Sequence, residues 1–492
     1  AIHVRHSHLH KSKTGLINFP VLLKVEGWLL MIESVFFLVP CITSFVYDEP
    51  DAIPFLVAAG ITALSGFLLN QYIHPRNKSL RKRESILVTS LTWVVFSIFG
   101  MIPFIFGSTH MSVSDGFFEA MSGFTTTGVS IISDPATLSH GILIWRSLLQ
   151  WIGGLGIILF TLAVIPMLNS AGGVHLYNSE VTGITHDKLT PRISSTAKRL
   201  WGIYLILTVS LTFLLWLGPM DIFESICHAL STVSTGGFST RAESIGAWHS
   251  DYITVVILIF MFIGGVNFTL MIKALTGSVK SLTANEVFQV YCKVIGIMTL
   301  IFGVLIMLNV RTMGWGEAAM NALFQVVSTI TSTGYTIGNY LAWGPACMMM
   351  ILLLMMVGGC AGSTSGGAKL DRILTVNRYV RNEIYRVIHP NVIKGVSVSG
   401  NVLSGDIINK TVAFILIYIG IIVIGAIALS IMGLPYIDSF YTSVSCTGNT
   451  GLGGEYIAVP DVGKWLLSFL MLTGRLEIYS VIVLFSKTFW KL

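Results

Sequence analysis

Four stretches of the chain place a serine six residues before a glycine, and mainly small or hydroxyl residues lie between the two. In single-letter code they are SGFTTTG, STVSTGG, STITSTG and SCTGNTG, ending at Gly128, Gly237, Gly334 and Gly451. Backbone carbonyls and threonine hydroxyls can replace the hydration shell of a cation, and glycine lets the backbone aim its carbonyls to one side. These residues therefore predict cation coordination by a loop.

Each loop belongs to a longer unit. A short amphipathic segment precedes the serine, an apolar stretch lies on either side, and another glycine follows 23 to 27 residues later. These later glycines are Gly153, Gly264, Gly358 and Gly474. The unit of span, short helix, polar loop and span therefore occurs four times, which predicts an internal fourfold repeat.

The composition places these repeats in a membrane. Of 492 residues, 53% are hydrophobic and 11% charged, and the mean hydropathy is +0.77. Apolar runs recur near the ~20 residues that a helix needs to cross a bilayer. We expect an all-α integral membrane protein with ten spans: about 27–47, 53–73, 85–106, 142–166, 200–217, 252–274, 287–309, 344–358, 411–432 and 463–486.

The distribution of charge orients these spans. Lysine and arginine gather after the second, fourth, sixth and eighth spans, including Arg76, Lys78, Lys188 and Arg192, while the opposite loops are mainly acidic. Because basic loops stay in the cytoplasm, both termini are expected there. The net charge of +6 is thus explained by the membrane and gives no evidence for nucleic-acid binding.

The predicted domain order follows from the repeats. It is a cytoplasmic tail (1–26), two N-terminal transmembrane helices (27–84), pore repeat 1 (85–168), pore repeat 2 (197–276), pore repeat 3 with a gating loop and a cytoplasmic helix (286–396), and pore repeat 4 (410–492).

Non-helical backbone at membrane depth must be buried in protein or line a wet cavity, because lipid cannot satisfy its polar groups. Four such loops would most simply meet around one axis and form an ion filter, with the negative C-terminal ends of the short helices favouring a cation. The alternative is that small residues only allow close helix packing. Four copies with one spacing favour the filter.

Together the motifs TTTGVS, STGGFS, TSTGYT and TGNTGLG resemble the Trk/Ktr/HKT superfamily of potassium transporters, particularly the bacterial Trk-type subunits, over nearly the whole chain. The resemblance implies a single-file potassium pathway of pseudo-fourfold symmetry, a homodimer in the cytoplasmic (inner) membrane, and potassium preference where the aligned residue is glycine. The implied potassium-binding filter residues are Thr126, Thr127, Gly128, Thr235, Gly236, Gly237, Ser332, Thr333, Gly334, Asn449, Thr450 and Gly451.

The fourth loop departs most from the others, and Gly448 is a rival filter glycine. We favour Gly451 because Asp438 and Asp115 each lie thirteen residues before the glycine of their loop.

The eighth predicted span runs into VGGCAGSTSGGAK, whose glycines and serines should break a helix. It resembles the family's intramembrane gating loop, which implies gate residues Gly362, Ser363, Thr364, Ser365, Gly366 and Gly367. A phosphate-binding P-loop is the alternative, but Ala368 before Lys369 breaks the required motif.

Arg475 and Glu477 lie inside the last apolar span. Ionisable residues at that depth usually face a cavity or a partner, and a structural ion pair is the alternative. The resemblance implies that Arg475 faces the pore, opposes cation passage and contacts the gating loop, so its neutralisation should raise flux.

Residues 370–396 alternate apolar and basic positions, which predicts an amphipathic cytoplasmic helix or simply a solvated charged face. The resemblance implies that a cytosolic TrkA-type ring of nucleotide-binding subunits docks there. No catalytic constellation or bound cofactor is expected, and potassium enters only as the transported ion. Coupling to protons or sodium, as in symport, stays open.

Two further sets of residues are of types that can bind a metal ion. His3, His6, His8 and His10 could hold a metal, but an exposed tail more often carries such residues incidentally. The six cysteines lack metal-ligand or disulfide spacing, so we expect them to be buried packing residues.

Overall fold

The computed structural model describes residues 17–75, 80–156, 193–392, 394–453 and 456–490. Nearly every element in these ranges is a helix, and the strands there are one two-residue hairpin, β1 (Ser397–Val398) with β2 (Asn401–Val402). The predicted all-α class is confirmed. The histidine tail, Arg76, Lys78, Lys188, Arg192 and the second half of the span at 142–166 lie outside the described residues.

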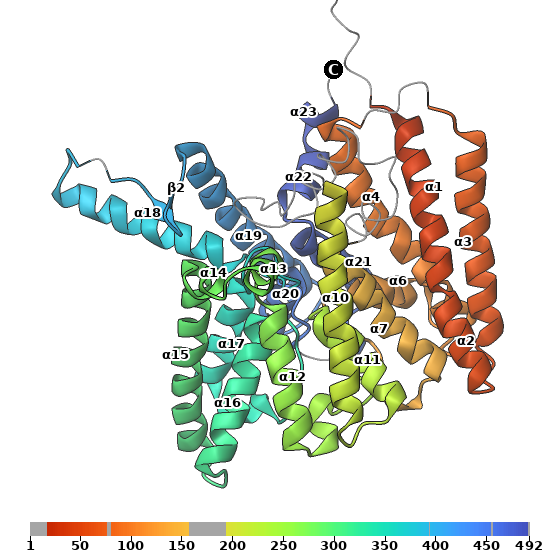
Figure 1. Cartoon of the computed structure of the whole chain (residues 1–492), viewed down its shortest axis with the longest axis horizontal. Coiled ribbons are helices and arrows are strands. Elements are labelled where there is room, and N and C mark those ends of the chain that lie inside the picture. Colours follow the sequence, from red (N-terminus) through yellow and green to blue (C-terminus); the bar gives the residue numbers. More distant parts are fainter. Residues whose placement is uncertain (1–16, 76–79, 157–192, 393, 454–455, 491–492) are drawn as a thin grey trace, which may run out of the picture.

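The N-terminal helices form one edge of the molecule (Figure 1). They are α1 (Phe19–Phe36), α2 (Leu38–Val46) and α3 (Ala52–Tyr72). Gly27 of α1 and Gly66 of α3 face each other, and a Cβ on Gly66 would lie 2.7 Å from the carbonyl oxygen of Gly27. Small residues at this crossing let the two backbones approach closely, as is common between membrane helices.

The four predicted repeats follow in order. Repeat 1 contains α4 (Lys82–Gly100), α5 (Ile102–Phe106), α6 (Val113–Phe124) and α7 (His140–Leu155). Repeat 2 contains α10 (Ile193–Trp216), α11 (Ile222–Val233), α12 (Asp251–Gly264) and α13 (Phe268–Thr276). Repeat 3 contains α15 (Glu286–Asn309), α16 (Trp315–Ile330) and α17 (Pro345–Val357). Repeat 4 contains α19 (Gly405–Ile431), α20 (Tyr436–Thr447), α21 (Asp461–Arg475) and α22 (Tyr479–Phe485).

Short elements connect these units. They are the 3-10 turns Pro135–Thr137, Ser244–Trp248, Tyr340–Trp343 and Tyr456–Ala458, and the helices α14 (Lys280–Thr283), α18 (Leu370–Ile388) and α23 (Lys487–Trp490). The predicted helix at 370–396 is present as α18, which projects sideways from the bundle (Figure 1). It ends at Ile388 because Pro390 disfavours helical backbone at His389.

Two segments predicted as single spans are broken. The chain bends by 99° between α12 and α13 and by 120° between α21 and α22. The first break follows Gly264 and Gly265, after which the Asn267 side chain caps α13. At the second break, Glu477 and Ile478 adopt positive φ angles of 53° and 43°. The predicted spans at 252–274 and 463–486 therefore each consist of two helices with a break between them.

Six described helical stretches are long and apolar enough to cross a membrane, or eight if each bent pair counts as one span. Two shorter helices, α7 and α17, occupy further predicted positions. The count of ten spans stays a prediction.

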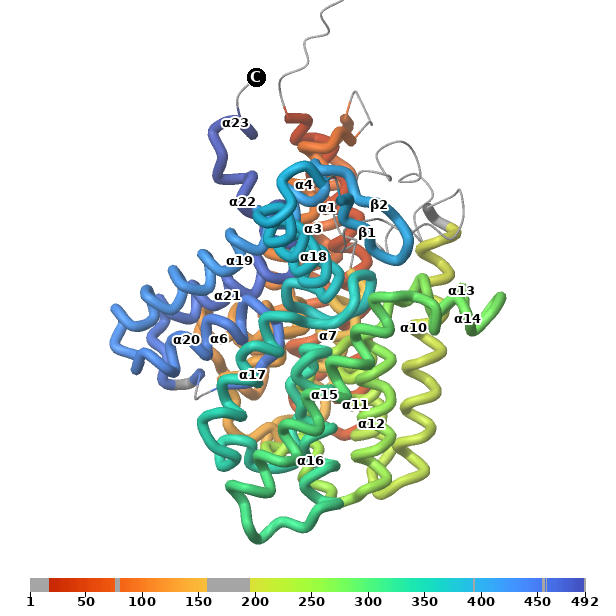
Figure 2. The backbone as a smooth tube through the Cα atoms, turned by 90° about the vertical axis from the view of Figure 1, so that its left-hand side faces the viewer, coloured from red at the N-terminus to blue at the C-terminus, as the bar shows by residue number. Residues whose placement is uncertain are grey.

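The repeats pack around a common centre. Figure 2 shows α20 and α21 of repeat 4 beside α6 of repeat 1, and α21 and α6 are among the helix pairs in most extensive contact. Contacts of α7 with α11, α12 with α16, and α17 with α20 complete the circuit. The last repeat is therefore a neighbour of the first.

Candidate functional site

The short helix of each repeat ends in a loop of the same backbone shape. The residue two before the glycine is left-handed in every loop, with φ of 54° at Thr126, 53° at Thr235, 53° at Ser332 and 52° at Asn449. The four glycines have φ of 79° at Gly128, 82° at Gly237, 84° at Gly334 and 81° at Gly451. Positive φ favours glycine at these four positions, although the residues two positions earlier adopt it with a side chain.

The serine six residues before the glycine closes each loop. Its carbonyl accepts a hydrogen bond from the N–H of the residue before the glycine, at 2.8 to 3.0 Å in all four loops. The donors are Thr127, Gly236, Thr333 and Thr450. The Ser122 and Ser328 hydroxyls also donate to the carbonyls of Val129 and Tyr335 beyond the glycine. The six-residue spacing between serine and glycine thus corresponds to a backbone hydrogen bond that closes each loop.

The four loops contact one another in a closed cycle. A Cβ on Gly128 would overlap the carbonyl oxygen of Gly236, and one on Gly237 would overlap that of Thr333. Likewise, Gly334 faces the carbonyl of Thr450, and Gly451 faces the carbonyl of Thr127. In each case the glycine of one loop lies against a backbone carbonyl of the next loop. That carbonyl belongs to the residue that directly precedes the next loop's own glycine.

This cycle identifies the fourth glycine by geometry. Gly451 shares the positive φ and the neighbour contact of the other three, whereas Gly448 has φ of −80° and caps the end of α20. The structure thus brings all twelve sequence-predicted loop residues to one centre. These residues are buried or half-buried, and each carbonyl of the cycle packs against the glycine of a neighbouring loop.

A buried ion pair lies behind the first two loops. Arg146 of α7 is 2% exposed, and its Nε donates to Glu119 of α6 at 2.9 Å. Its Nη2 donates to the Ser130 hydroxyl at 3.1 Å, and its guanidinium lies 4.1 Å from the ring centre of Phe238. Because Phe238 directly follows Gly237, Arg146 joins loops 1 and 2.

Gln150, one turn further along α7, holds the second loop at two points. Its Nε2 donates to the carbonyl of Gly236 at 2.8 Å, and its Oε1 accepts from the N–H of Phe238 at 3.1 Å. Glu119, Arg146 and Gln150 were not among the residues predicted from the sequence. The available signal was the same one that marked Arg475: charged or amide side chains inside an apolar helix.

The loop between α17 and α18 lies against the closed cycle. Thr364 Oγ1 is 3.2 Å from the hydroxyl of Thr235 in loop 2. The N–H of Gly366 donates to the hydroxyl of Ser332 in loop 3, and a Cβ on Gly366 would overlap the carbonyl of Gly448 beside loop 4. The predicted gate residues therefore contact three of the four repeats.

Arg475 connects this loop with the first repeat. Its Nη1 donates to the carbonyl of Thr364 at 3.0 Å, and its Nη2 donates to the carbonyls of Gly153 and Gly154 at the end of α7. Glu477 does not pair with Arg475 in the described contacts. Instead it forms an ion pair with Arg372 of α18, which holds the helix after the loop.

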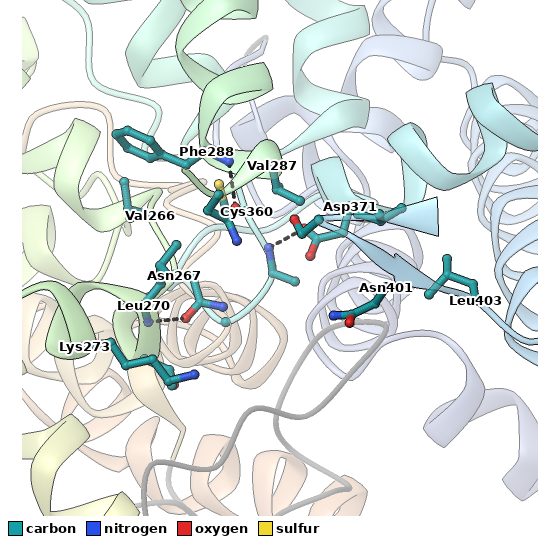
Figure 3. A pocket seen from close by; sticks show the side chains of 16 residues that line it. Val266, Asn267, Leu270, Lys273, Val287, Phe288, Cys360, Asp371, Asn401 and Leu403 are labelled. Atoms are coloured by element: carbon teal, nitrogen blue, oxygen red, sulfur yellow. Dashed lines mark hydrogen bonds between the residues drawn. The ribbon is translucent and has the colours of Figure 1, made fainter. Parts of the chain in front are cut away.

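A cavity of about 300 Å³ lies beside the first part of the loop and is lined by Cys360, Ala361 and Gly362 among others. Figure 3 shows that Cys360, Asp371, Asn267 and Lys273 line it from the loop and the neighbouring helices. The N–H of Ala361 donates to Asp371 at 2.8 Å, and the N–H of Phe268 donates to the Gly362 carbonyl at 3.0 Å. The loop between α17 and α18 is therefore held by hydrogen bonds to α13 and α18 as well as by its contacts with loops 2 and 3.

No group of three or more potential metal-ligating His, Cys, Asp or Glu side chains occurs within the described ranges. The six cysteines are unpaired there, four of them buried.

Comparisons with known proteins agree on one family. The family model TrkH, described as a cation transport protein, matches residues 59–491. The Trk system potassium uptake protein TrkH of Escherichia coli K12 is 33% identical over 487 residues, covering 96% of this chain and all of that protein. The Trk system potassium uptake protein TrkG of the same strain is 31% identical, covering 94% of this chain and 97% of TrkG. The crystal structure of the potassium transporter TrkH from Vibrio parahaemolyticus superposes with a TM-score of 0.87 at 31% identity, covering 96% and 100% of the two chains.

Proposed function

Because the chain belongs to the TrkH family of cation transport proteins, we propose that it takes up potassium across the bacterial cytoplasmic membrane through the four-loop cycle. The observation that carries this proposal is the repeated contact between the glycine of each loop and a carbonyl of the next. Four equivalent carbonyls around one axis are the arrangement that can replace the hydration shell of a single ion.

The filter works through backbone rather than charge. In each loop the carbonyl before the glycine faces the neighbouring glycine, and no side chain intervenes because glycine has none. The negative C-terminal ends of α6, α11, α16 and α20 adjoin the four loops and favour a cation over an anion. We expect potassium and rubidium to pass in preference to sodium and lithium.

The loop at 358–369 is the proposed gate, since it lies against loops 2 and 3 through Thr364 and Gly366. Arg475 has two roles in this proposal. Its positive charge opposes a cation beside the filter, and its hydrogen bond to Thr364 holds the gating loop in place. Ions pass when this loop moves away.

Regulation is proposed to come from outside the chain. The helix α18 continues directly from the gating loop and carries Arg378, Arg381 and Arg386. A cytosolic TrkA-type nucleotide-binding ring docked on this helix would move the gate through Leu370, the first residue of α18. We also propose that the protein is a homodimer and that both of its termini lie in the cytoplasm.

The test is cation flux into liposomes that contain the purified protein, comparing potassium, rubidium, sodium and lithium. Native protein should favour potassium and rubidium. Gly128→Ser should weaken that preference, because the new Cβ overlaps the Gly236 carbonyl at a positive φ. Gly420→Ser in α19 is the matched control, since no other group lies within 4 Å of a Cβ there.

Folding is checked by gel filtration and thermal unfolding of each variant. Equal flux of all four cations through the native protein would overturn the filter. So would a folded Gly128→Ser variant with the selectivity of Gly420→Ser.

A further inference from the structure

Two carboxyl groups are buried in α1, outside the proposed ion pathway. Glu26 is 2% exposed and Glu33 is 0% exposed. They are seven residues apart, which puts them on the same face of the helix about 10 Å from each other along its axis. That face packs on α4 of the first pore repeat.

Most of the oxygen atoms of this pair have no partner. Glu26 Oε1 accepts a hydrogen bond from the Thr92 hydroxyl of α4 at 2.8 Å. Glu26 Oε2 and both oxygens of Glu33 have no hydrogen-bond partner among the described residues. An ionised carboxylate in such surroundings is very costly, whereas a protonated carboxyl is tolerated.

Among the described residues, the neighbouring elements place no charged side chain against this pair, and Lys82 and Arg83 at the start of α4 are exposed. Helices α2 and α3 contain no charged residue. On α4, Glu84 is held by the backbone N–H groups of Asn18 and Arg81, while Lys24 of α1 donates to the carbonyl of Asn70.

The charged residues of repeat 1 and of the last span also have partners other than Glu26 and Glu33. In α6, Glu119 pairs with Arg146 of α7, and Asp115 pairs with Lys464 of α21. Arg475 donates to backbone carbonyls of the gating loop and α7.

Glu33 lies directly behind the first pore loop. A Cβ on Gly100 of α4 would lie 3.7 Å from Glu33 Oε1 and 3.0 Å from the ring of Phe124. Phe124 is the last residue of α6 and is followed at once by loop 1. The negative end of α6 further disfavours a carboxylate at Glu33.

Glu26 lies at the other end of the same face of α1, on the side of the proposed gate. Its partner Thr92 precedes Trp93, and the guanidinium of Arg475 lies 5.8 Å from the centre of the Trp93 ring. Glu33 is therefore separated from loop 1 by Gly100 and Phe124, and Glu26 is separated from Arg475 of the proposed gate by Thr92 and Trp93.

We propose that Glu26 and Glu33 form a proton-binding site beside the pore. Both carboxyls hold protons in this conformation, and loss of the Glu33 proton separates α1 from the end of α6 and changes ion flux. The effect on flux rests on the proposed function, whereas proton binding does not. A bound potassium ion does not fit, because the few oxygens present cannot replace its hydration shell.

The first experiment is infrared difference spectroscopy of the purified protein between pH 6 and pH 10. The carbonyl stretch of a protonated carboxyl in a dry environment should disappear at high pH in the native protein. Glu33→Gln should lose part of that signal, and Glu26→Gln another part. Glu243→Gln is the control, because that carboxyl is exposed. A native spectrum without the band, or an unchanged band in both buried variants, overturns the site.

The second experiment measures potassium flux in liposomes over the same pH range. The native flux should change with pH, and Glu33→Gln should abolish much of that change, because the amide has the same shape but cannot ionise. If Glu33→Gln does not fold, Glu26→Gln carries the test. An infrared band with pH-independent native flux overturns the link to transport only, whereas absence of potassium flux at every pH overturns the proposed function.

Discussion

Loops 1 and 2 of the cycle are each held from behind by a charged or ring side chain of their own short helix, whereas the described residues of the short helices before loops 3 and 4 provide no such side chain. Nine residues before the glycine stand Glu119, His228, Gln325 and Thr442. Glu119 bonds to the Ser130 hydroxyl at 2.8 Å, and His228 Nε2 lies 2.9 Å from the Ser239 hydroxyl. Both contacts span from the short helix to the chain just after the glycine.

The equivalent side chain before loop 3, Gln325, does not bond to the chain after the glycine in the described contacts. Gln325 bonds to Thr329 on its own helix at 3.4 Å. Loop 3 instead receives the N–H of Gly366, and Asn449 of loop 4 donates to Thr127 and to the carbonyl of Met471. Loops 1 and 2 are thus fixed to α7, whereas loops 3 and 4 contact Gly366 of the gating loop and the last span. Loop 2 also meets the gating loop, through Thr235 and Thr364. The difference suggests a rigid half and a half that responds to the gate.

The largest expected effect is on the rigid half. Arg146→Met removes the partner of Glu119 and leaves that carboxylate buried and unpaired, which should cost about 3–5 kcal/mol of stability. Arg241→Met is the matched control, because Arg241 pairs with Glu224 at the surface, where such a pair contributes about 1 kcal/mol or less. Thermal unfolding in detergent measures both.

Removing both buried charges in Arg146→Met/Glu119→Gln should recover part of the loss, since the unpaired carboxylate is then absent. The comparison of the two halves fails if Arg146→Met unfolds at the same temperature as Arg241→Met.

The next effect is on the responsive half. Arg475→Ala removes hydrogen bonds from a charged group to Thr364 and Gly153, each contributing about 1.5–3 kcal/mol. We expect the gating loop to leave the cycle more often and potassium flux to rise about tenfold or more. Flux into liposomes is the measurement, with Arg311→Ala at an exposed site as control. Unchanged flux in a folded Arg475→Ala variant would remove Arg475 from the gate.

The sequence was sufficient for the repeats because the serine-to-glycine spacing is a local property. The Ser122 carbonyl closes its own loop, so its spacing recurs wherever that loop recurs. The fold class followed from hydropathy for a similar reason, since bilayer thickness fixes helix length.

Contacts between repeats could not be predicted from the sequence. Arg146 and Glu119 lie on different helices, and Gln150 bonds to a loop in the next repeat, 86 positions away. No periodic pattern connects such positions. The break after Arg475 was also missed, because Glu477 and Ile478 are ordinary helix residues by propensity and adopt positive φ only under tertiary contacts.

The smallest expected effect concerns one hydroxyl of the gating loop. Thr364→Val keeps the shape of the side chain but removes its hydrogen bonding to the carbonyls of Val233 and Gly264, both 3.2 Å away. A net contribution of about 0.5–1.5 kcal/mol predicts a rise in flux of roughly two- to tenfold, smaller than for Arg475→Ala. Thr276→Val is the control, since that hydroxyl bonds only within α13. If Thr364→Val changes flux no more than this control, the loop is held by Arg475 and its backbone contacts, and the hydroxyl contact with Thr235 plays no part in gating.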